Sequence, residues 1–443
     1  MKKKVFALMV TLILAASMLA ACGDSGGSSA GGSEGGSQAQ ATGDAPASIK
    51  VGVLNPTTGM YAGMAEGTPY VDEFFRDYVN DELGGIYIED YDAKLPIELV
   101  IYDTASNSDK TSELAAKLIT EDQVDVLIAR HTPDTGVPAA TVAEQYGVPC
   151  IITDCPAGAF FGVGDHYWSF DAHADNPSYY EAYSGIWKAA GYEAGADNAT
   201  IGWIFANDLD GTILAPEYKA LAEADGYTVL DPGAYAAGTN DYSSLINQLK
   251  GAGIEVVFGV MSNPEFGTFW TQCQQLGYKP KIVVIGKAFM LESQAMAIGA
   301  ELMDGIGNEI WWDVRFPYKS ALMDMSGEEF GDQYYAATGK QAASPQGAKF
   351  ASYEILIDAL SRSANLEPET IRTAIAETDI DSIMGHINYG NYEVENFCKM
   401  PVVGGQWILQ EDGSLAQEIV SNPHPENDIP VTAEVKTSGR AWE

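Results

Sequence analysis

The stretch PIELVIYDTASNSDKTSELAAKLITEDQVDVLIA, residues 96–129, decides the fold class. It begins with an apolar run at 96–103 and ends with another at 124–129, and both runs predict short strands. Between them, residues 108–122 repeat apolar side chains at helical spacing behind Ser108, a residue type suited to capping a helix N-terminus. Two buried strands joined by a helix form the unit of a parallel sheet that is covered on both faces.

The same alternation of strands and helices continues on both sides of this stretch. Before a break near Asn198, it predicts strands at 49–54 and 148–153 and a helix at 135–147. A second series predicts strands at 199–206, 227–231, 254–261 and 281–286, with helices at 211–226, 241–253 and 265–277. The remainder is helix-rich and predicts helices at 328–339, 345–364 and 368–378 and a closing hairpin at 404–422. Because the two series share one rhythm, the sequence predicts an α/β protein with two doubly wound parallel-sheet lobes.

The N-terminus has the composition of an export signal. Three lysines precede an uncharged run that ends at Cys22, which predicts a signal peptide at 1–21. Leu19-Ala20-Ala21-Cys22 resembles the lipobox of bacterial lipoproteins, and this resemblance implies lipid attachment to Cys22. An ordinary signal peptide with an accidental cysteine is the alternative. The Gly/Ser-rich composition predicts a flexible tether at 22–47.

Composition limits the classes of function. The chain of 443 residues carries 24 Lys and Arg against 62 Asp and Glu, a formal net charge of −38, which disfavours binding to nucleic acid. The cysteines and histidines show no spacing typical of a metal site, and no catalytic motif stands out, so no enzyme activity, metal or cofactor is predicted. A disulfide between Cys150 and Cys155 is conceivable in an exported protein, but their apolar setting favours free buried thiols.

Several phrases resemble the periplasmic-type substrate-binding proteins of ABC importers, in the class of the leucine-binding protein. These phrases are IKVGVLNPTTG at 49–59, the stretch at 96–129, GAYAAGTNDYSSLINQLKGAGIEVVFGVMSNPEFGTFWTQCQQLG at 233–277 and GGQWILQEDGS at 404–414. The resemblance covers about 48–425. It implies a type I, Venus-flytrap architecture whose lobes are joined by three hinge crossings, with lobe one at 48–171 plus 288–395, lobe two at 172–287 plus 396–425, and a C-terminal tail at 426–443.

The expected ligand cleft lies where the carboxyl ends of the strands meet. The loop after the third predicted strand leads into a helix N-terminus, which favours anionic groups. The resemblance implies that this loop binds the ligand's α-carboxylate, so Thr132 and Thr135 are candidate hydroxyl donors, and Arg130 and His131 candidate charges. Pro133 stands where the family has a serine, so that hydroxyl is absent. The alternatives are an exposed loop pair for Arg130 and His131, and helix capping for Thr135.

Five further positions complete the candidate site. Asp154 and Cys155 follow the next strand, where Asp154 could bind an ammonium or hydroxyl group, or simply cap the turn. The resemblance implies that Glu265 contacts the α-ammonium of an amino acid, and a favourable interaction with the helix dipole is the alternative. Asp208 lies in the first loop of lobe two, and Tyr61 lies near the position of an aromatic residue that packs on the ligand in relatives.

The sequence thus predicts a lipoprotein at the cell surface or in the periplasm, held on the membrane through Cys22. It is expected to capture a small polar ligand, an amino acid or a related small carboxylate, and to deliver it to an ABC permease and ATPase. Aromatic residues near the predicted crossings suit a ligand larger or flatter than leucine, and they are Trp168, Phe170, Trp311 and Trp312. A monomer is expected, and the alternatives are a ligand-sensing receptor of the same fold and a surface α/β enzyme.

Overall fold

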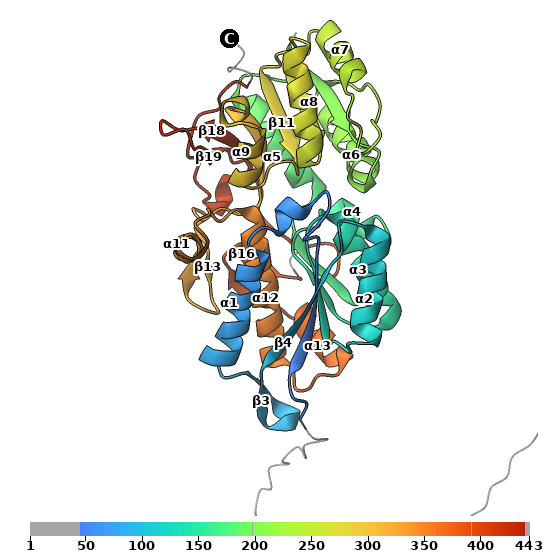
Figure 1. Ribbon diagram of the computed structural model, residues 1–443, viewed down its shortest axis with the longest axis vertical. Coiled ribbons are helices and arrows are strands. Elements are labelled where there is room, and N and C mark those ends of the chain that lie inside the picture. Colours follow the sequence, from blue (N-terminus) through green and yellow to red (C-terminus); the bar gives the residue numbers. More distant parts are fainter. Residues whose placement is uncertain (1–44, 197, 391, 439–443) are drawn as a thin grey trace, which may run out of the picture. The chain divides into compact units, whose positions relative to one another are not determined.

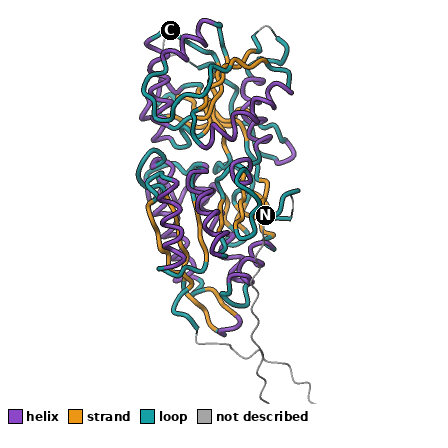
Figure 2. The backbone as a smooth tube through the Cα atoms, turned by 90° about the vertical axis from the view of Figure 1, so that its right-hand side faces the viewer, coloured by secondary structure: helices purple, strands orange, loops and turns teal. Residues whose placement is uncertain are grey.

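Two separate sheets, each flanked by helices, organise the protein (Figure 1). The computed structural model describes residues 45–196, 198–390 and 392–438, which belong to one compact unit. The predicted signal peptide, Cys22 and most of the predicted tether lie outside the described residues. In Figure 2 the strands form two groups, each surrounded by helices. We call each sheet, with the helices that cover it, a lobe.

The first sheet is wholly parallel and has six strands. Their order across the sheet is β17 (Phe397–Lys399), β7 (Ser169–His173), β6 (Cys150–Ile152), β5 (Val126–Ala129), β1 (Ile49–Asn55) and β4 (Ile97–Asp103). One face is covered by α1 (Thr68–Asp77) and α12 (Ser344–Arg362), and the other by α2 (Ser108–Thr120) and α3 (Pro133–Tyr146). Side chains alternate between the faces, as a strand requires: Val51 and Val53 pack toward α1 and α12, and Leu54 toward α2 and α3.

The second sheet has seven strands, of which five are parallel neighbours. The order is β19 (Leu415–Ser421), β18 (Val403–Leu409), β12 (Ile306–Ile310), β11 (Ile282–Gly286), β10 (Val256–Val260), β8 (Thr200–Phe205) and β9 (Thr228–Leu230), with β18 antiparallel to both neighbours. One face packs against α5 (Asn176–Ala189) and α6 (Leu209–Ala224), and the other against α7 (Ser243–Gly251) and α8 (Asn263–Gln275).

Both sheets follow the same chain order. Across the sheets the orders are β4-β1-β5-β6-β7 and β9-β8-β10-β11-β12. In each order, the sheet's second strand along the chain comes first, its first strand lies next to it, and the later strands follow in chain order. The strand order therefore reverses beside β1 in one lobe and beside β8 in the other. Ligands of open α/β sheets bind at the carboxyl ends of the strands near such a reversal. The prediction of two doubly wound lobes is confirmed.

The chain passes between the sheets three times. The passages lie between β7 and α5, between β12 and β13 (Lys319–Ser320), and between β17 and β18. Two strands fall on the other side of the boundaries that the sequence predicted. Residues of β12 were expected in lobe one and those of β17 in lobe two, and the sheet topology places each in the opposite lobe. The reason for β12 is that Asn308 and Glu309 interrupt its apolar pattern, so it does not read as a buried strand.

Shorter elements fill the connections. Helices α4 (Ala157–Phe161), α9 (Glu292–Ile298), α10 (Ala300–Met303), α11 (Gly327–Thr338) and α13 (Pro368–Ala376) accompany the hairpins β2–β3 (Ile86–Ile88, Ala93–Leu95), β13–β14 (Lys319–Ser320, Met325–Ser326) and β15–β16 (Asp379–Ser382, Gly385–Asn388). Single turns of 3₁₀ helix lie at Ala62–Ala65, Glu89–Tyr91 and Pro425–Asn427, and a π-helical turn at Tyr78–Glu82. None of the helices in the described part of the chain combines the length and hydropathy needed to cross a membrane.

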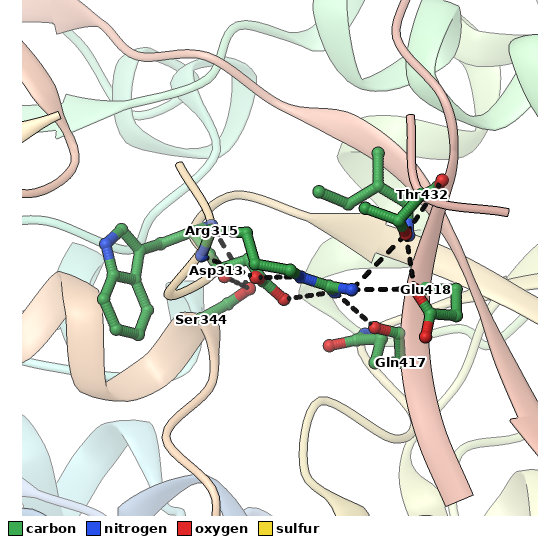
Figure 3. A network of polar contacts seen from close by, with 8 residues as sticks. Asp313, Arg315, Ser344, Gln417, Glu418 and Thr432 are labelled. Atoms are coloured by element: carbon green, nitrogen blue, oxygen red, sulfur yellow. Dashed lines mark hydrogen bonds and ion pairs between the residues drawn. The ribbon is translucent and has the colours of Figure 1, made fainter. Parts of the chain in front are cut away.

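The second passage is fixed to both lobes by a polar network (Figure 3). The Arg315 guanidinium donates to Asp313 at 2.7 and 2.8 Å, and to the Glu418 carboxylate on β19 at 2.7 Å. On the other side, Ser344 at the start of α12 donates its hydroxyl to the Trp312 carbonyl at 2.9 Å. This passage is therefore tied to β19 of the second lobe and to α12 of the first.

The cysteines contribute to packing. Cys150 on β6 and Cys155 in the following loop are buried free thiols, so the alternative of a disulfide between them is excluded by the structure. Burial raises the pKa of both thiols. Cys273 on α8 is also a buried free thiol.

Candidate functional site

A cavity of about 40 Å³ lies where strand ends of the two sheets face each other. This volume has room for a few water molecules. The lining residues come from both lobes, and they are Met64, Thr132, Pro133, Asp154, Pro156, His173, Tyr179, Tyr183, Asp210, Leu214, Tyr218, Val260, Lys287, Glu309 and Trp311.

The parallel strands explain why polar residues gather here. Thr132 follows β5, Asp154 follows β6 and Lys287 follows β11, while Glu309 and Trp311 come from the end of β12. These residues lie at or just beyond the carboxyl ends of parallel strands, and this arrangement brings their side chains into one space. The expected cleft at the carboxyl ends of the strands is therefore present.

Lys287 is the central cation of this space. Its ammonium forms an ion pair with Asp210 and lies 3.8 Å from the Asp208 carboxylate and 3.9 Å from that of Asp134. The same nitrogen lies 4.4 Å from the centre of the Tyr61 ring and 3.3 Å from its hydroxyl. Burial alone would lower the pKa of Lys287, but Asp210 and the neighbouring acids outweigh it and hold this pKa well above its usual value. Lys287 joins the two lobes, because Tyr61 and Asp134 belong to the first and Asp210 to the second.

Burial raises the pKa of two acids beside Lys287. Burial is the main cause that raises the pKa of Asp210 to about 6, against the opposing charge of Lys287, so Asp210 is ionised at neutral pH. Burial raises the pKa of Glu309 to about 8, so Glu309 is mostly protonated there. Its Oε1 atom accepts from the Lys287 amide at 3.0 Å, and the nearby Tyr183 side chain opposes part of this rise in pKa.

The N-terminus of α3 supplies two buried hydroxyls. Thr132 is 4% exposed and Thr135 is fully buried, and neither side-chain oxygen has a hydrogen-bond partner among the described residues. Thr132 lines the cavity, whereas Thr135 lies one turn further along α3 and does not line it. His131, Thr132 and Lys287 all have left-handed backbone conformations, with φ of 66°, 69° and 71°. Such conformations are costly for side chains with a Cβ and occur preferentially at ligand sites.

Two histidines contact side chains that line the cavity. Nδ1 of His131 lies 2.8 Å from the Asp154 carboxylate, which also accepts the His131 amide at 2.9 Å. Nε2 of His173 lies 2.5 Å from the Tyr179 hydroxyl. Burial lowers the pKa of each histidine to about 4, so both rings are neutral at pH 7. His131 therefore supports Asp154 from behind and does not act as a cation.

Arg130 lies in the core of the first lobe and does not line the cavity. Its guanidinium contacts the Asp72 carboxylate at 2.6 Å and donates to the Ser352 hydroxyl at 3.1 Å. The Tyr353 ring centre lies 4.9 Å away. These contacts make Arg130 part of the packing between β5, α1 and α12. The alternative of an exposed loop residue is wrong for both Arg130 and His131, because both are fully buried.

Glu265 caps α8. Its carboxylate accepts from the Ser262 amide at 3.0 Å and the Ser262 hydroxyl at 2.7 Å, and from the Gly238 amide at 2.8 Å. It is 4% exposed and does not line the cavity. These contacts give Glu265 a structural role close to the alternative that the sequence offered. The Ser-x-x-Glu spacing from Ser262 to Glu265 is the sequence signal for such a capping box.

The remaining predicted residues divide between the site and the core. Tyr61 and Asp208 lie beside the Lys287 ammonium, as described above. Cys155 is fully buried and packs with the core between α3 and the first sheet. Of the four aromatic residues expected near the crossings, Trp311 lines the cavity, and Trp312 fills the core beside the second passage.

Several lining residues were missed by the sequence analysis. Lys287 stands directly after the predicted strand at 281–286, so its position at a strand end was the available signal. Tyr179 and Tyr183 lie on α5, whose helix was not predicted, and Glu309 lies on the missed strand β12. Within the described ranges, no cluster of three or more His, Cys, Asp or Glu side chains has a metal-binding arrangement. The site offers ion pairing, hydrogen bonding and aromatic packing.

Comparison with known proteins gives consistent matches over most of the chain. Residues 48–403 match a family model described as periplasmic binding protein. The chain is 27% identical over 393 residues to Leu/Ile/Val-binding protein homolog 8 of Brucella melitensis biotype 1, covering 86% of this chain and 92% of that protein.

Two solved structures show the same fold. The leucine binding protein LivK of Thermotoga maritima superposes with a TM-score of 0.69 at 20% identity, covering 85% of this chain and 99% of that one. A solute binding protein of an ABC transporter from Rhodopseudomonas palustris BisB5, in complex with 3,4-dihydroxy benzoic acid, gives a TM-score of 0.67 at 16% identity, covering 86% of this chain and 100% of the other.

Proposed function

Since the chain belongs to the periplasmic binding protein family, we propose that it captures a small polar solute between its lobes and delivers it to the permease and ATPase of an ABC importer. This family consists of binding proteins and not of enzymes. Amino acids are the first solutes to consider, because the relative from Brucella and the structure from Thermotoga are both named for such ligands. Related small carboxylates are the second, because one structural neighbour holds a dihydroxybenzoate.

The observation that carries the proposal is the cavity between opposed strand ends. It collects buried polar groups from both lobes, and the Thr132 hydroxyl and the Trp311 indole nitrogen have no hydrogen-bond partner in the described part of the chain. Leaving such groups unpaired costs about 1–3 kcal/mol each. A solute that pairs with them recovers this free energy, and one that cannot is rejected.

Capture requires the lobes to separate. The cavity is lined by residues of both lobes, and three chain passages allow a hinge motion between them. A solute that contacts both lobes binds the closed form better than the open one, so it shifts the population toward closure. The proposed lipid anchor on Cys22 would keep this cycle at the outer face of a membrane, near the permease.

The proposal is tested by binding without turnover. Thermal shift and Trp fluorescence measured against amino acids, small carboxylates and aromatic acids should reveal a stabilising solute that is recovered unchanged by chromatography. Release of a product from any of them would favour an enzyme. No stabilising solute within these classes would contradict the proposal.

A matched pair of variants locates the binding site. Thr132→Val removes an unpaired buried hydroxyl from the cavity, so it should lower the affinity for the solute identified in the screen by about tenfold, without lowering the stability of the protein. Thr141→Val is the control, because Thr141 is exposed on the same helix and its hydroxyl donates to the Val137 carbonyl at 2.9 Å. Equal affinity in both variants would place the solute elsewhere.

A further inference from the structure

The Lys287 ammonium occupies a position built to hold a cationic nitrogen. A carboxylate, that of Asp210, pairs with it, and the face of the Tyr61 ring lies 4.4 Å away. Carboxylates and aromatic faces are groups that proteins commonly use to bind ammonium and related cations. The Lys287 side chain lines the cavity and is only 9% exposed, so it is largely shielded from water.

Acidic groups outnumber the lysine around this position. Asp134 of the first lobe and Asp208 of the second have carboxylate oxygens within 4 Å of the Lys287 nitrogen. Asp154 also lines the cavity, and its carboxylate faces a neutral His131. Among the lining residues in the described ranges, Lys287 is the only lysine or arginine. A purely anionic solute would therefore enter a space with an excess of negative charge.

Two buried polar groups indicate that a solute completes the site. The Thr132 hydroxyl and the Trp311 indole N–H both line the cavity, both residues are 4% exposed, and neither group is paired within the described residues. They lie among three tyrosines of the second lobe that form an aromatic wall, Tyr179, Tyr183 and Tyr218. These groups suit a solute with an apolar or aromatic body and a hydrogen-bonding group.

Resting on the proposed function, we propose that the solute carries a cationic nitrogen, and that this nitrogen binds against Asp210 and Tyr61 in place of the Lys287 ammonium. Lys287 then acts as an internal occupant, which fills the cation position and joins the lobes while no solute is present. A carboxylate on the solute is optional, whereas the charged nitrogen is required. This selects amines and amino acids, and it rejects acids that lack an amine.

Two matched series test the required charge by isothermal titration calorimetry on the folded protein. One consists of phenethylamine, L-phenylalanine and 3-phenylpropanoate, and the other of 3-methylbutylamine, L-leucine and 4-methylpentanoate. In at least one series, the members with an amine should bind at least tenfold more tightly than the acid alone. Preference for the acid overturns this inference and leaves the proposed function standing. If none of the six binds and the solute found by the thermal-shift screen lacks a cationic nitrogen, this inference alone is overturned, whereas no stabilising solute in that screen contradicts both.

Variants test whether the Lys287 ammonium occupies the position that the nitrogen of the solute would take. Lys287→Met removes the internal occupant, so the affinity for the amine that binds should rise roughly tenfold. Asp210→Asn should lower it by roughly tenfold or more, while Glu223→Gln, an exposed acid on the same helix, should leave it unchanged. Loss of amine binding in Lys287→Met would show that the lysine contacts the solute directly, which overturns the proposal.

One further variant guards against misfolding. Asp210→Asn alone leaves Lys287 buried beside fewer carboxylates, so the double variant Lys287→Met/Asp210→Asn removes both charges together. It should melt as one transition and bind the amine at least tenfold more weakly than Lys287→Met. Equal affinity in these two proteins would show that Asp210 does not hold the cation, and would overturn the proposal.

Discussion

Replacement of Arg130 by methionine separates a structural role from a binding role. The Arg130 guanidinium is fully buried, and its Nη1 lies 2.6 Å from Asp72, itself only 2% exposed. Methionine keeps much of the side-chain volume but leaves the Asp72 carboxylate buried, with the Tyr353 hydroxyl at 2.8 Å as its remaining donor. Breaking one partner of a buried pair costs about 3–5 kcal/mol, because the other charge loses both its counter-ion and its water.

The magnitude is measured by urea unfolding followed by circular dichroism. Arg130→Met should lower the free energy of unfolding by about 3–5 kcal/mol, while the double variant Arg130→Met/Asp72→Leu should recover most of this loss, since it leaves no unpaired charge. Arg76→Met is the matched control. Arg76 lies on the same helix as Asp72, its pair with Asp77 is about half exposed, and its loss should cost no more than about 1 kcal/mol.

Solute binding by the Arg130→Met variant gives the result that would refute the structural role of Arg130. Arg130 does not line the cavity, so Arg130→Met should bind the solute with unchanged affinity under conditions where it is folded. If the variant were as stable as the wild type but had lost solute binding, Arg130 would contact the solute, and its assignment to the lobe core would be refuted.

Three further variants probe other polar groups of the fold. Glu265→Ala should lower the free energy of unfolding by about 1–3 kcal/mol, because the Gly238 and Ser262 amides lose their acceptor. Solute affinity measured by calorimetry should be unchanged. A loss of affinity without a loss of stability would show that Glu265 contacts the solute. Arg315→Met frees Glu418 from the second passage, so hydrogen exchange at 311–320 should quicken, and unchanged protection would refute the clamp. Burial lowers the pKa of Lys349 to about 7, so the unfolded chain binds more protons than the folded one between about pH 7 and 10.5. The free energy of unfolding should therefore rise with pH in this range, by up to about 1.4 kcal/mol per pH unit. Lys349→Met should flatten this rise, and an identical slope in both proteins would refute the assignment to Lys349.

The sequence predicted strands correctly where buried apolar residues follow one another without interruption. Continuous apolar runs such as 49–54 and 254–261 predicted strands that the structure contains within two residues at each end, since both faces of a parallel sheet are covered. The pattern failed at β12, because its Asn308 and Glu309 are polar although they are buried. A strand that carries site residues loses the regular pattern by which strands are recognised.

Site residues were predictable by position more than by type. Asp154 directly follows a predicted strand, and Thr132 was found through the family resemblance of the loop before α3; the argument from strand ends, applied to Lys287, would have found it as well. The partner of a charged residue is not visible in the sequence. Arg130 and Asp72 are 58 positions apart, so nothing local showed that this arginine is neutralised in the core.

The Lys287–Asp210 pair is better explained by function than by stability. Removing two charges from water is costly, and apolar residues of similar size often replace a buried ion pair with no loss or with a gain in stability. The lysine of this pair has a left-handed backbone conformation, as do His131 and Thr132 at the start of α3, and each of these conformations is unfavourable. A fold under selection for stability alone would keep neither the pair nor the strained loops. Both features lie where the lobes meet, which is where we propose that a solute takes the place of the Lys287 ammonium.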